Sequence, residues 1–210
     1  MISLRNFNPN ITCANVYYHN NIKGAINDCY VRETVAEKLL QALSFLPEGY
    51  SFKIFDAWRP YVVQKALYDD FAAKMRKDPA YSSLSSEDFK VELHKFVSVP
   101  TLNKDKPFVH STGGAVDLTL MFNGVEVEMG TEFDETSKLA YTDYFENNNE
   151  NIVARLNRKI LLNAMAKAGF TNLESEWWHF DYGDNFWSEI TKSEAIYKGI
   201  LSIEDLSKYL

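Results

Sequence analysis

The sequence predicts an α+β fold in which helices pack around a small antiparallel sheet. Helical and strand-like segments do not alternate regularly along the chain, which disfavours a doubly wound parallel sheet. The best-marked strands, residues 115–122 and 125–129, are separated by Asn123-Gly124, a strong signal for a two-residue hairpin turn. Because 210 residues are more than one small domain needs and fewer than two average ones require, we expect residues 1–210 to form a single domain.

Periodicity and capping signals predict the other elements. In the segment over residues 150–168, Ile152, Leu156, Ile160 and Ala164 share one helical stripe with basic residues interleaved, and Gly169 follows as the C-terminal cap. Ser85 and Asp88 form a capping-box pattern. The expected elements are helices over residues 33–46, 60–76, 86–97 and 150–168, strands over 51–57 and within 170–182, loops over 101–107 and 131–149, and peripheral helix after 182.

Composition excludes several classes of protein. The formal net charge is −7 and the cations are scattered, which argues against nucleic-acid binding. No apolar stretch approaches the roughly 20 residues that span a bilayer, so we expect no membrane partner. The first residues lack a secretory signal pattern, which predicts a cytoplasmic protein. In that compartment Cys13 and Cys29 are expected to be free thiols.

A first candidate site string spans residues 109–117 and has the form H-x-x-G-x-A-x-D. A Gly-Gly turn separates His110 from Asp117, so both side chains can point to one spot. Imidazole nitrogen and carboxylate oxygen are ligands that zinc accepts at about 2.0 to 2.2 Å. The competing interpretation is a loop histidine and an unrelated surface aspartate.

A second string, over residues 174–180, places Glu176 three residues before His179 between aromatic side chains. Charge interactions are stronger where water is scarce, as a catalytic carboxylate requires. An edge strand with a core tryptophan pair would explain the same pattern. Together with the first string, however, the ligands and a spare glutamate match the plan of a catalytic zinc site.

A third string, Asp56-Ala57-Trp58-Arg59-Pro60, lies between a predicted strand and a predicted helix. A guanidinium held there by Asp56 could direct donors at a developing oxyanion or at a carboxylate. The alternative is that Arg59 forms only a structural ion pair with Asp56.

Four motifs in order resemble the D-alanyl-D-alanine dipeptidases, the VanX-like zinc peptidases. They are D-A-W-R-P at 56–60, H-x-x-G-x-A-x-D at 110–117, M-G-T-x-F-D at 129–134 and E-W-W-H-F at 176–180. That family is related to the D-Ala-D-Ala carboxypeptidases, and in fold to the hedgehog signalling domain. The resemblance therefore implies that the small antiparallel sheet carries a zinc site and that the substrate is a small dipeptide.

The resemblance also implies a role for particular residues. His110, Asp117 and His179 would be the ligands of one Zn²⁺ per chain. Glu176 would be the general base that acts on the catalytic water and then the acid that protonates the leaving amine. Arg59 would hold the tetrahedral oxyanion, and Asp134 would meet the free amino group of the dipeptide.

Two departures from the family pattern bear on specificity. Phe108 stands where the family usually has a serine, two positions before the first ligand, and Trp58 replaces the more usual tyrosine. A carboxypeptidase acting on peptidoglycan stem peptides is therefore one alternative. A non-catalytic zinc module that binds a partner is another, although such a module needs neither Glu176 nor Arg59. The oligomeric state is not predicted.

Overall fold

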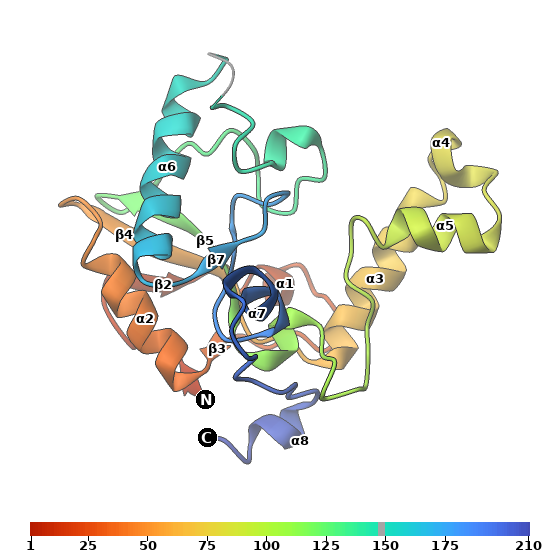
Figure 1. Ribbon diagram of the computed structural model, residues 1–210, viewed down its shortest axis with the longest axis horizontal. Coiled ribbons are helices and arrows are strands. Elements are labelled where there is room, and N and C mark those ends of the chain that lie inside the picture. The colour runs from red at the N-terminus through yellow and green to blue at the C-terminus, as the bar shows by residue number, and fades with distance from the viewer. Residues whose placement is uncertain (147–149) are drawn as a thin grey trace.

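The computed structural model describes residues 1–146 and 150–210, so residues 147–149 of the loop expected at 131–149 lie outside the described part (Figure 1). The strands are β1 (Ile2–Ser3), β2 (Ile11–Cys13), β3 (Tyr30–Val31), β4 (Tyr50–Asp56), β5 (Ala115–Phe122), β6 (Val125–Glu126), β7 (Thr171–Asn172) and β8 (His179–Asp181). The helices are α1 (Val16–His19), α2 (Glu33–Leu43), α3 (Tyr61–Met75), α4 (Pro79–Ser82), α5 (Ser86–Leu93), α6 (Ile152–Lys167), α7 (Asn185–Thr191) and α8 (Ile203–Leu206), with 3-10 turns η1 (Val109–Thr112) and η2 (Lys138–Ala140).

The expected α+β class is confirmed, and its main sheet has the strand order β2-β4-β5-β8-β7, with β6 paired to β5. Most neighbours are antiparallel, but β2 adds to β4 in parallel, so the sheet is mixed. β1 and β3 form a separate antiparallel pair. The sequence did not predict β2, because three residues are too short to show a periodicity.

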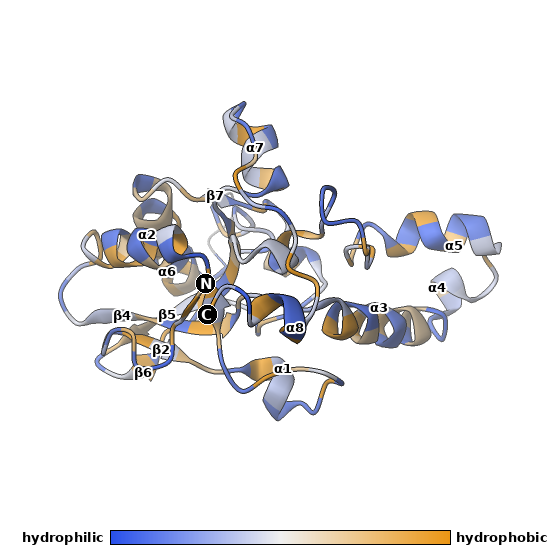
Figure 2. Ribbon diagram, turned by 90° about the horizontal axis from the view of Figure 1, so that it is seen from below, coloured by the Kyte–Doolittle hydropathy of each residue, from blue (hydrophilic) through white to orange (hydrophobic). Residues whose placement is uncertain are grey.

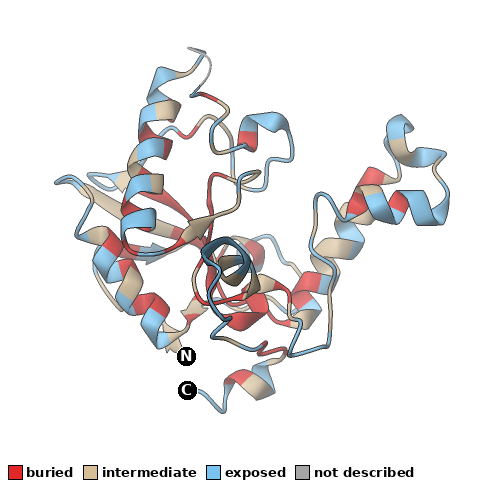
Figure 3. Ribbon diagram, viewed as in Figure 1, coloured by how far each residue is buried: buried red, intermediate tan, exposed pale blue. Residues whose placement is uncertain are grey.

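Helices cover both faces of the sheet: α2 and α6 lie on one side and α1 on the other (Figure 2). The strands in the middle contribute side chains that are wholly buried, and their ribbon is coloured red as buried at the centre of Figure 3. These side chains include Phe52, Ile54, Leu118, Leu120 and Phe180. Burying a side chain of this size stabilises a fold by about 1.5 to 3 kcal/mol, so the core holds the middle strands in place.

The hairpin turn forms as predicted, but its second strand is short. Asn123 and Gly124 have φ of 48° and 81°, both left-handed as a type I′ turn requires. β6 then ends at Glu126, whereas the sequence predicted pairing to residue 129. The reason is competition for the backbone, since Asn157 and Arg158 of α6 donate to the carbonyls of Glu128 and Met129 at 2.8 and 2.7 Å.

The same contacts explain why the predicted stripe of α6 is buried only toward its C-terminal end, at Ala164. Ile152 and Leu156 are 50% and 52% exposed, and the buried face carries Asn157 and Arg158. Arg158 also donates to the carbonyls of Tyr141 and Leu139, at 2.7 and 2.9 Å. The N-terminal half of this face therefore meets the loop over 128–141, whereas Leu161 and Met165 in its C-terminal half pack into the hydrophobic core.

Of the other predicted helices, α3 forms close to its expected bounds, and α5 ends at Leu93, four residues before its expected end. α2 stops three residues early, because Phe45 and Leu46 donate to the carbonyls of Ala42 and Leu43 in tightened turns before Pro47. Ser85 accepts from the Asp88 amide at 3.1 Å, which confirms the cap of α5. α3, α4 and α5 project from the sheet as an arm with a small core of its own (Figures 1 and 3). No described helix is long and apolar enough to cross a membrane.

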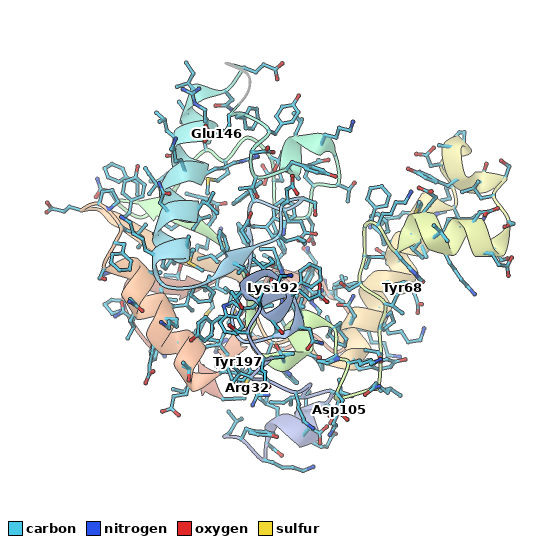
Figure 4. The ribbon with its side chains drawn as sticks, in the orientation of Figure 1. Arg32, Tyr68, Asp105, Glu146, Lys192 and Tyr197 are labelled. Atoms are coloured by element: carbon cyan, nitrogen blue, oxygen red, sulfur yellow. The ribbon has the colours of Figure 1, made fainter. Side chains whose placement is uncertain are left out.

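The C-terminal segment wraps back onto the body of the molecule, where Arg32 holds it. Arg32 donates to the carbonyls of Thr112 at 2.7 Å and Lys198 at 2.8 Å. Its guanidinium also lies 5.0 Å from the ring centre of Tyr197, and the two side chains lie together in Figure 4. These contacts tie the segment to η1.

Candidate metal centre

The strand register places three site residues in a row across the sheet. Asp56 on β4 lies opposite Asp117 on β5, and Asp117 lies opposite His179 on β8. Side chains directly opposite each other on neighbouring strands have Cβ atoms about 4.5 to 5.5 Å apart. A bulge between Ile54 and Asp56 shifts the register of β4 just before this row.

His110 reaches the row from η1, which directly precedes β5. Gly113 ends η1 with φ of 73°, a left-handed conformation that glycine adopts without strain. The chain is thereby reversed, and His110 Nε2 lies 3.3 Å from Asp117 Oδ2. The two histidine rings approach each other edge to face at 5.0 Å. The Gly-Gly turn therefore brings His110 and Asp117 together, as the motif predicts.

These three residues form one buried group in which a metal could sit. One ligand atom from each of His110, Asp117 and His179 lies within 4.8 Å of the others. His110 Nδ1 donates to the carbonyl of Ala57 at 2.8 Å, while His179 Nε2 donates to Asp181 Oδ1 at 2.9 Å. The remaining nitrogen of each ring faces Asp117, at 3.3 Å for His110 and 2.8 Å for His179.

Electrostatics at this group favour a cation. Burial opposes the ionisation of Asp117, but the adjacent imidazoles hold the pKa of its carboxyl well below the usual range. Burial likewise opposes charge on His179, but Asp181 and Asp117 on either side raise the pKa of its imidazole well above the usual value. Two nitrogens and one carboxylate oxygen that leave a further coordination position open are a donor set that fits zinc.

Arg59 is fixed beside the ligands by a second set of contacts. Its Nε and Nη2 lie 2.8 and 2.7 Å from Asp56 Oδ2, and its Nη1 donates to Gln64 at 2.8 Å. Nη2 is 3.6 Å from Asp117 Oδ2. Burial opposes its charge, but Asp56 and other nearby acids raise the pKa of Arg59, which stays protonated. Arg59 thus makes the ion pair with Asp56 and also points its cation into the site.

Glu176 lies in the tight turn before β8. Its amide donates to the carbonyl of Leu173 at 3.0 Å, and the His179 amide donates to the Glu176 carbonyl at 3.3 Å. Burial of its carboxyl group raises the pKa of Glu176, while the positive field of His179 opposes the rise. The charges of His179 and Asp117 act on this carboxyl group, so it lies within electrostatic range of the ligand candidates.

Asp134 is linked to Arg59 by Tyr17, a residue that the sequence analysis did not predict. The Tyr17 hydroxyl donates to Asp134 Oδ2 at 2.9 Å and lies 3.5 Å from Arg59 Nη2. Tyr17 is buried, and burial raises the pKa of its phenol well above the usual value, so the group stays a donor. It comes from the four-residue helix α1, which carries no periodic signal that could have predicted it.

The loop that carries Asp134 is anchored on both sides. Trp177 donates from its indole to Thr131 Oγ1 at 2.7 Å, and Arg158 holds the carbonyl of Met129. Gly130, with φ of 89°, leaves no room for a side chain, since an added Cβ would lie 2.3 Å from the Phe145 ring. The M-G-T-x-F-D and E-W-W-H-F motifs are therefore packed against each other.

Other residues singled out in the sequence lie elsewhere. His19 is exposed, and His94, also exposed, contacts the Tyr68 hydroxyl at 3.0 Å on the projecting arm. Trp58 donates its indole N–H to the carbonyl of Ile200, so it holds the C-terminal segment. Phe108 is buried at the start of η1. Cys13 and Cys29 are free thiols, and the Cys29 thiol donates to Asn15 Oδ1 at 3.1 Å.

The buried cluster of two histidines and one aspartate defines the class of this protein as a candidate metalloprotein. Within that class, the chain belongs to the M15 peptidase family described as D-ala-D-ala dipeptidase, whose model matches residues 9–196.

Curated relatives agree with this family. A D-alanyl-D-alanine dipeptidase of Synechocystis sp. is 31% identical over 175 residues, which cover 75% of this chain and 71% of the relative. The protein of the same name from Escherichia coli is 28% identical over 155 residues, covering 73% and 66% of the two chains. A solved structure of a vancomycin resistance D,D-pentapeptidase VanY mutant with Zn(II) is 15% identical, with a TM-score of 0.46 and coverage of 80% and 81%.

Proposed function

We propose that this protein hydrolyses the free dipeptide D-alanyl-D-alanine to two molecules of D-alanine with one zinc ion per chain. The observation that carries the proposal is the convergence of His110, Asp117 and His179 within 4.8 Å of one another. Glu176 and Arg59 interact with these ligands, and neither would be needed at a purely structural site. Their presence favours hydrolysis over a non-catalytic zinc module.

Each residue has a chemical task in this reaction. Zinc held by the three ligands would supply a Lewis acid that makes water a stronger acid and polarises the scissile carbonyl. Glu176 accepts a proton from the attacking water and then delivers it to the nitrogen of the leaving D-alanine. Its raised pKa suits both steps, because a base and acid work best near the operating pH. Arg59 directs its guanidinium group at the carbonyl oxygen of the scissile peptide bond, which becomes negative when water adds to the carbon.

Recognition of a free dipeptide requires a group that meets its ammonium. Asp134, held by Tyr17 at 2.9 Å, supplies an acidic group at the edge of the site. A carboxylate paired with an ammonium gives a charge-assisted hydrogen bond, which is stronger than a neutral one. Phe108 cannot replace the polar contact of the serine usual at its position. We therefore assign amine recognition to Asp134 and Tyr17.

Blocking the substrate amine tests this assignment against the carboxypeptidase alternative. We expect N-acetyl-D-Ala-D-Ala to be cleaved with a kcat/KM about 10²-fold or more below that of the free dipeptide, because the acetyl group removes the charge that Asp134 meets. Initial rates on both substrates measure the ratio. Asp134→Asn should reduce the ratio by slowing cleavage of the free dipeptide alone. Equal rates on the two substrates would instead identify an enzyme for longer stem peptides.

Substrate binding should depend on pH through Asp134. Burial of its carboxyl group, together with the negative charge of Asp117, raises the pKa of Asp134 to about 7. Below that pH the carboxyl takes up a proton and loses its attraction for the ammonium, which stays charged. KM should therefore rise as pH falls from about 7.5 to 5.5, approaching tenfold per unit at the acid end. In Asp134→Asn the KM should be high and nearly constant over this range, and a wild-type KM that is equally flat would contradict the role.

A further inference from the structure

Two buried carboxyl groups lie behind the metal-ligand candidate His179, on the side away from Asp117. Asp181 is the last residue of β8 and Asp184 is the N-cap of α7, and both are 0% exposed. Gly183 joins them with φ of 74°, and a Cβ there would lie 2.5 Å from the Tyr197 ring. This left-handed turn brings Asp184 back toward Asp181. In the described part of the chain, no lysine or arginine forms an ion pair with either carboxyl group.

The hydrogen bonds found for these two carboxyl groups leave one oxygen of each without a partner among the described residues. Asp181 Oδ1 accepts from His179 Nε2 at 2.9 Å, and Asp184 Oδ1 accepts from the Trp187 amide at 3.0 Å. Asp181 Oδ2 and Asp184 Oδ2 are buried, and neither finds a donor among the described residues. Buried polar atoms without a partner are rare in native proteins, because losing water without a replacement costs about 1 to 3 kcal/mol.

A single proton shared by the two groups satisfies both atoms. A hydrogen bond between the two carboxyl groups requires that one of them be protonated. Burial, and next the charge of Asp181, raises the pKa of Asp184 to about 8, so Asp184 is the protonated partner near neutral pH. Asp184 then donates from Oδ2 to Asp181, which is left as a carboxylate facing His179.

We propose that Asp181 and Asp184 are positioning residues for the zinc ligand His179. Asp184 acts as a neutral donor that orients Asp181, and Asp181 accepts the Nε2–H of His179. This contact keeps the proton on Nε2, so the lone pair of His179 Nδ1 is free to bind zinc. Nδ1 lies 2.8 Å from Oδ1 of Asp117, the neighbouring ligand candidate. His110 receives the corresponding support from the carbonyl of Ala57. The proposal rests on the proposed zinc site.

The two supports differ in charge, and this difference has a measurable consequence. A carboxylate that accepts from a ligating imidazole makes that imidazole a better donor to the metal, whereas a neutral carbonyl mainly orients the ring. Removing such a carboxylate typically weakens metal binding by about 10- to 100-fold. Zinc affinity, rather than the chemistry of hydrolysis, is therefore the property that Asp181 should control.

Zinc dissociation constants, measured by competition with a chromophoric chelator, test the proposal. Asp181→Asn keeps the size and loses the charge, so its dissociation constant should rise by about 10- to 100-fold. Asp184→Asn keeps a donor for Asp181 and should stay within about threefold of the wild type. Asp184→Ala removes the donor, so its dissociation constant should lie between those of Asp184→Asn and Asp181→Asn. The matched control is Asp78→Asn, an N-cap substitution on α4 in the projecting arm, which should leave affinity unchanged.

A spectroscopic measurement separates positioning from a general loss of structure. In the zinc-loaded wild type, the Nε2–H proton of His179 should give a downfield signal in the proton NMR spectrum, because it is hydrogen-bonded to a carboxylate. The signal should move upfield in Asp181→Asn and stay in place in Asp184→Asn and Asp78→Asn. Circular dichroism confirms that each variant is folded.

The outcomes distinguish this proposal from the zinc site on which it rests. If the wild type binds zinc and Asp181→Asn binds it equally tightly, the positioning role is overturned and the zinc site stands. Equal weakening in Asp184→Asn and Asp184→Ala would also overturn the role of Asp184 as a donor. If the wild type itself binds no zinc, both proposals fail.

Discussion

Glu176→Gln should lower kcat for D-Ala-D-Ala hydrolysis by about 10³-fold, in the middle of the range that a general base contributes. The amide has nearly the shape of the carboxylate, so the turn that places residue 176 against Leu173 should be kept. The amide cannot accept a proton from water or return one to the leaving nitrogen. Zinc content should remain that of the wild type, because Glu176 is not among the clustered ligands.

The matched control for this change is Glu174→Gln. Glu174 lies two residues away in the same turn, but it is exposed. Its substitution should change kcat by less than about twofold, as expected for a surface position away from the site. Steady-state kinetics and metal analysis on the two variants and the wild type make the comparison. Retention of more than about a tenth of the wild-type kcat in Glu176→Gln would remove Glu176 from the role of general base.

His110→Ala should lose both zinc and activity. The substitution removes one of three clustered ligands, so the remaining two side chains should hold the ion much more weakly. Without the metal the catalytic water keeps a pKa far above neutral, and kcat/KM should fall by about 10⁴-fold or more. Loss of the hydrogen bond to the Ala57 carbonyl should cost only about 1 kcal/mol of stability.

His94→Ala is the control for this prediction. His94 is an exposed histidine on the projecting arm, where it contacts the Tyr68 hydroxyl. Its removal should leave zinc content and kcat/KM unchanged. Metal analysis of the purified variants and rates on D-Ala-D-Ala provide the data. A His110→Ala protein that keeps stoichiometric zinc would show that the ligand set is wrong.

The central part of the site could be predicted from the sequence because its residues fall in short motifs. The Gly-Gly turn between His110 and Asp117 and the three-residue step from Glu176 to His179 are local patterns, and local geometry largely decides where their side chains point. Tyr17 and Asp181 gave no such signal. Tyr17 lies in a four-residue helix. Asp181 contacts His179 because residues two apart in an extended strand lie on the same face, and here both belong to β8.

The fold was predictable to the same extent. Asn123-Gly124 and the capping residues Ser85 and Asp88 act within a few positions, and the structure confirms each of them. The part of the buried face of α6 around Arg158 was not predictable, because Arg158 is buried to bind three carbonyls of a loop distant in sequence. A periodicity of apolar residues cannot reveal a helix face whose partner is a polar backbone.

Zinc titration of the stripped wild-type protein tests the central claim most directly. The metal is removed with a chelator, the chelator is dialysed away, and zinc is returned in small steps while hydrolysis of D-Ala-D-Ala is followed. Activity should be nearly absent at first, rise in proportion to added zinc and level off at one equivalent per chain. Full activity before any zinc is added, or no hydrolysis of the dipeptide after one equivalent is bound, would contradict the account.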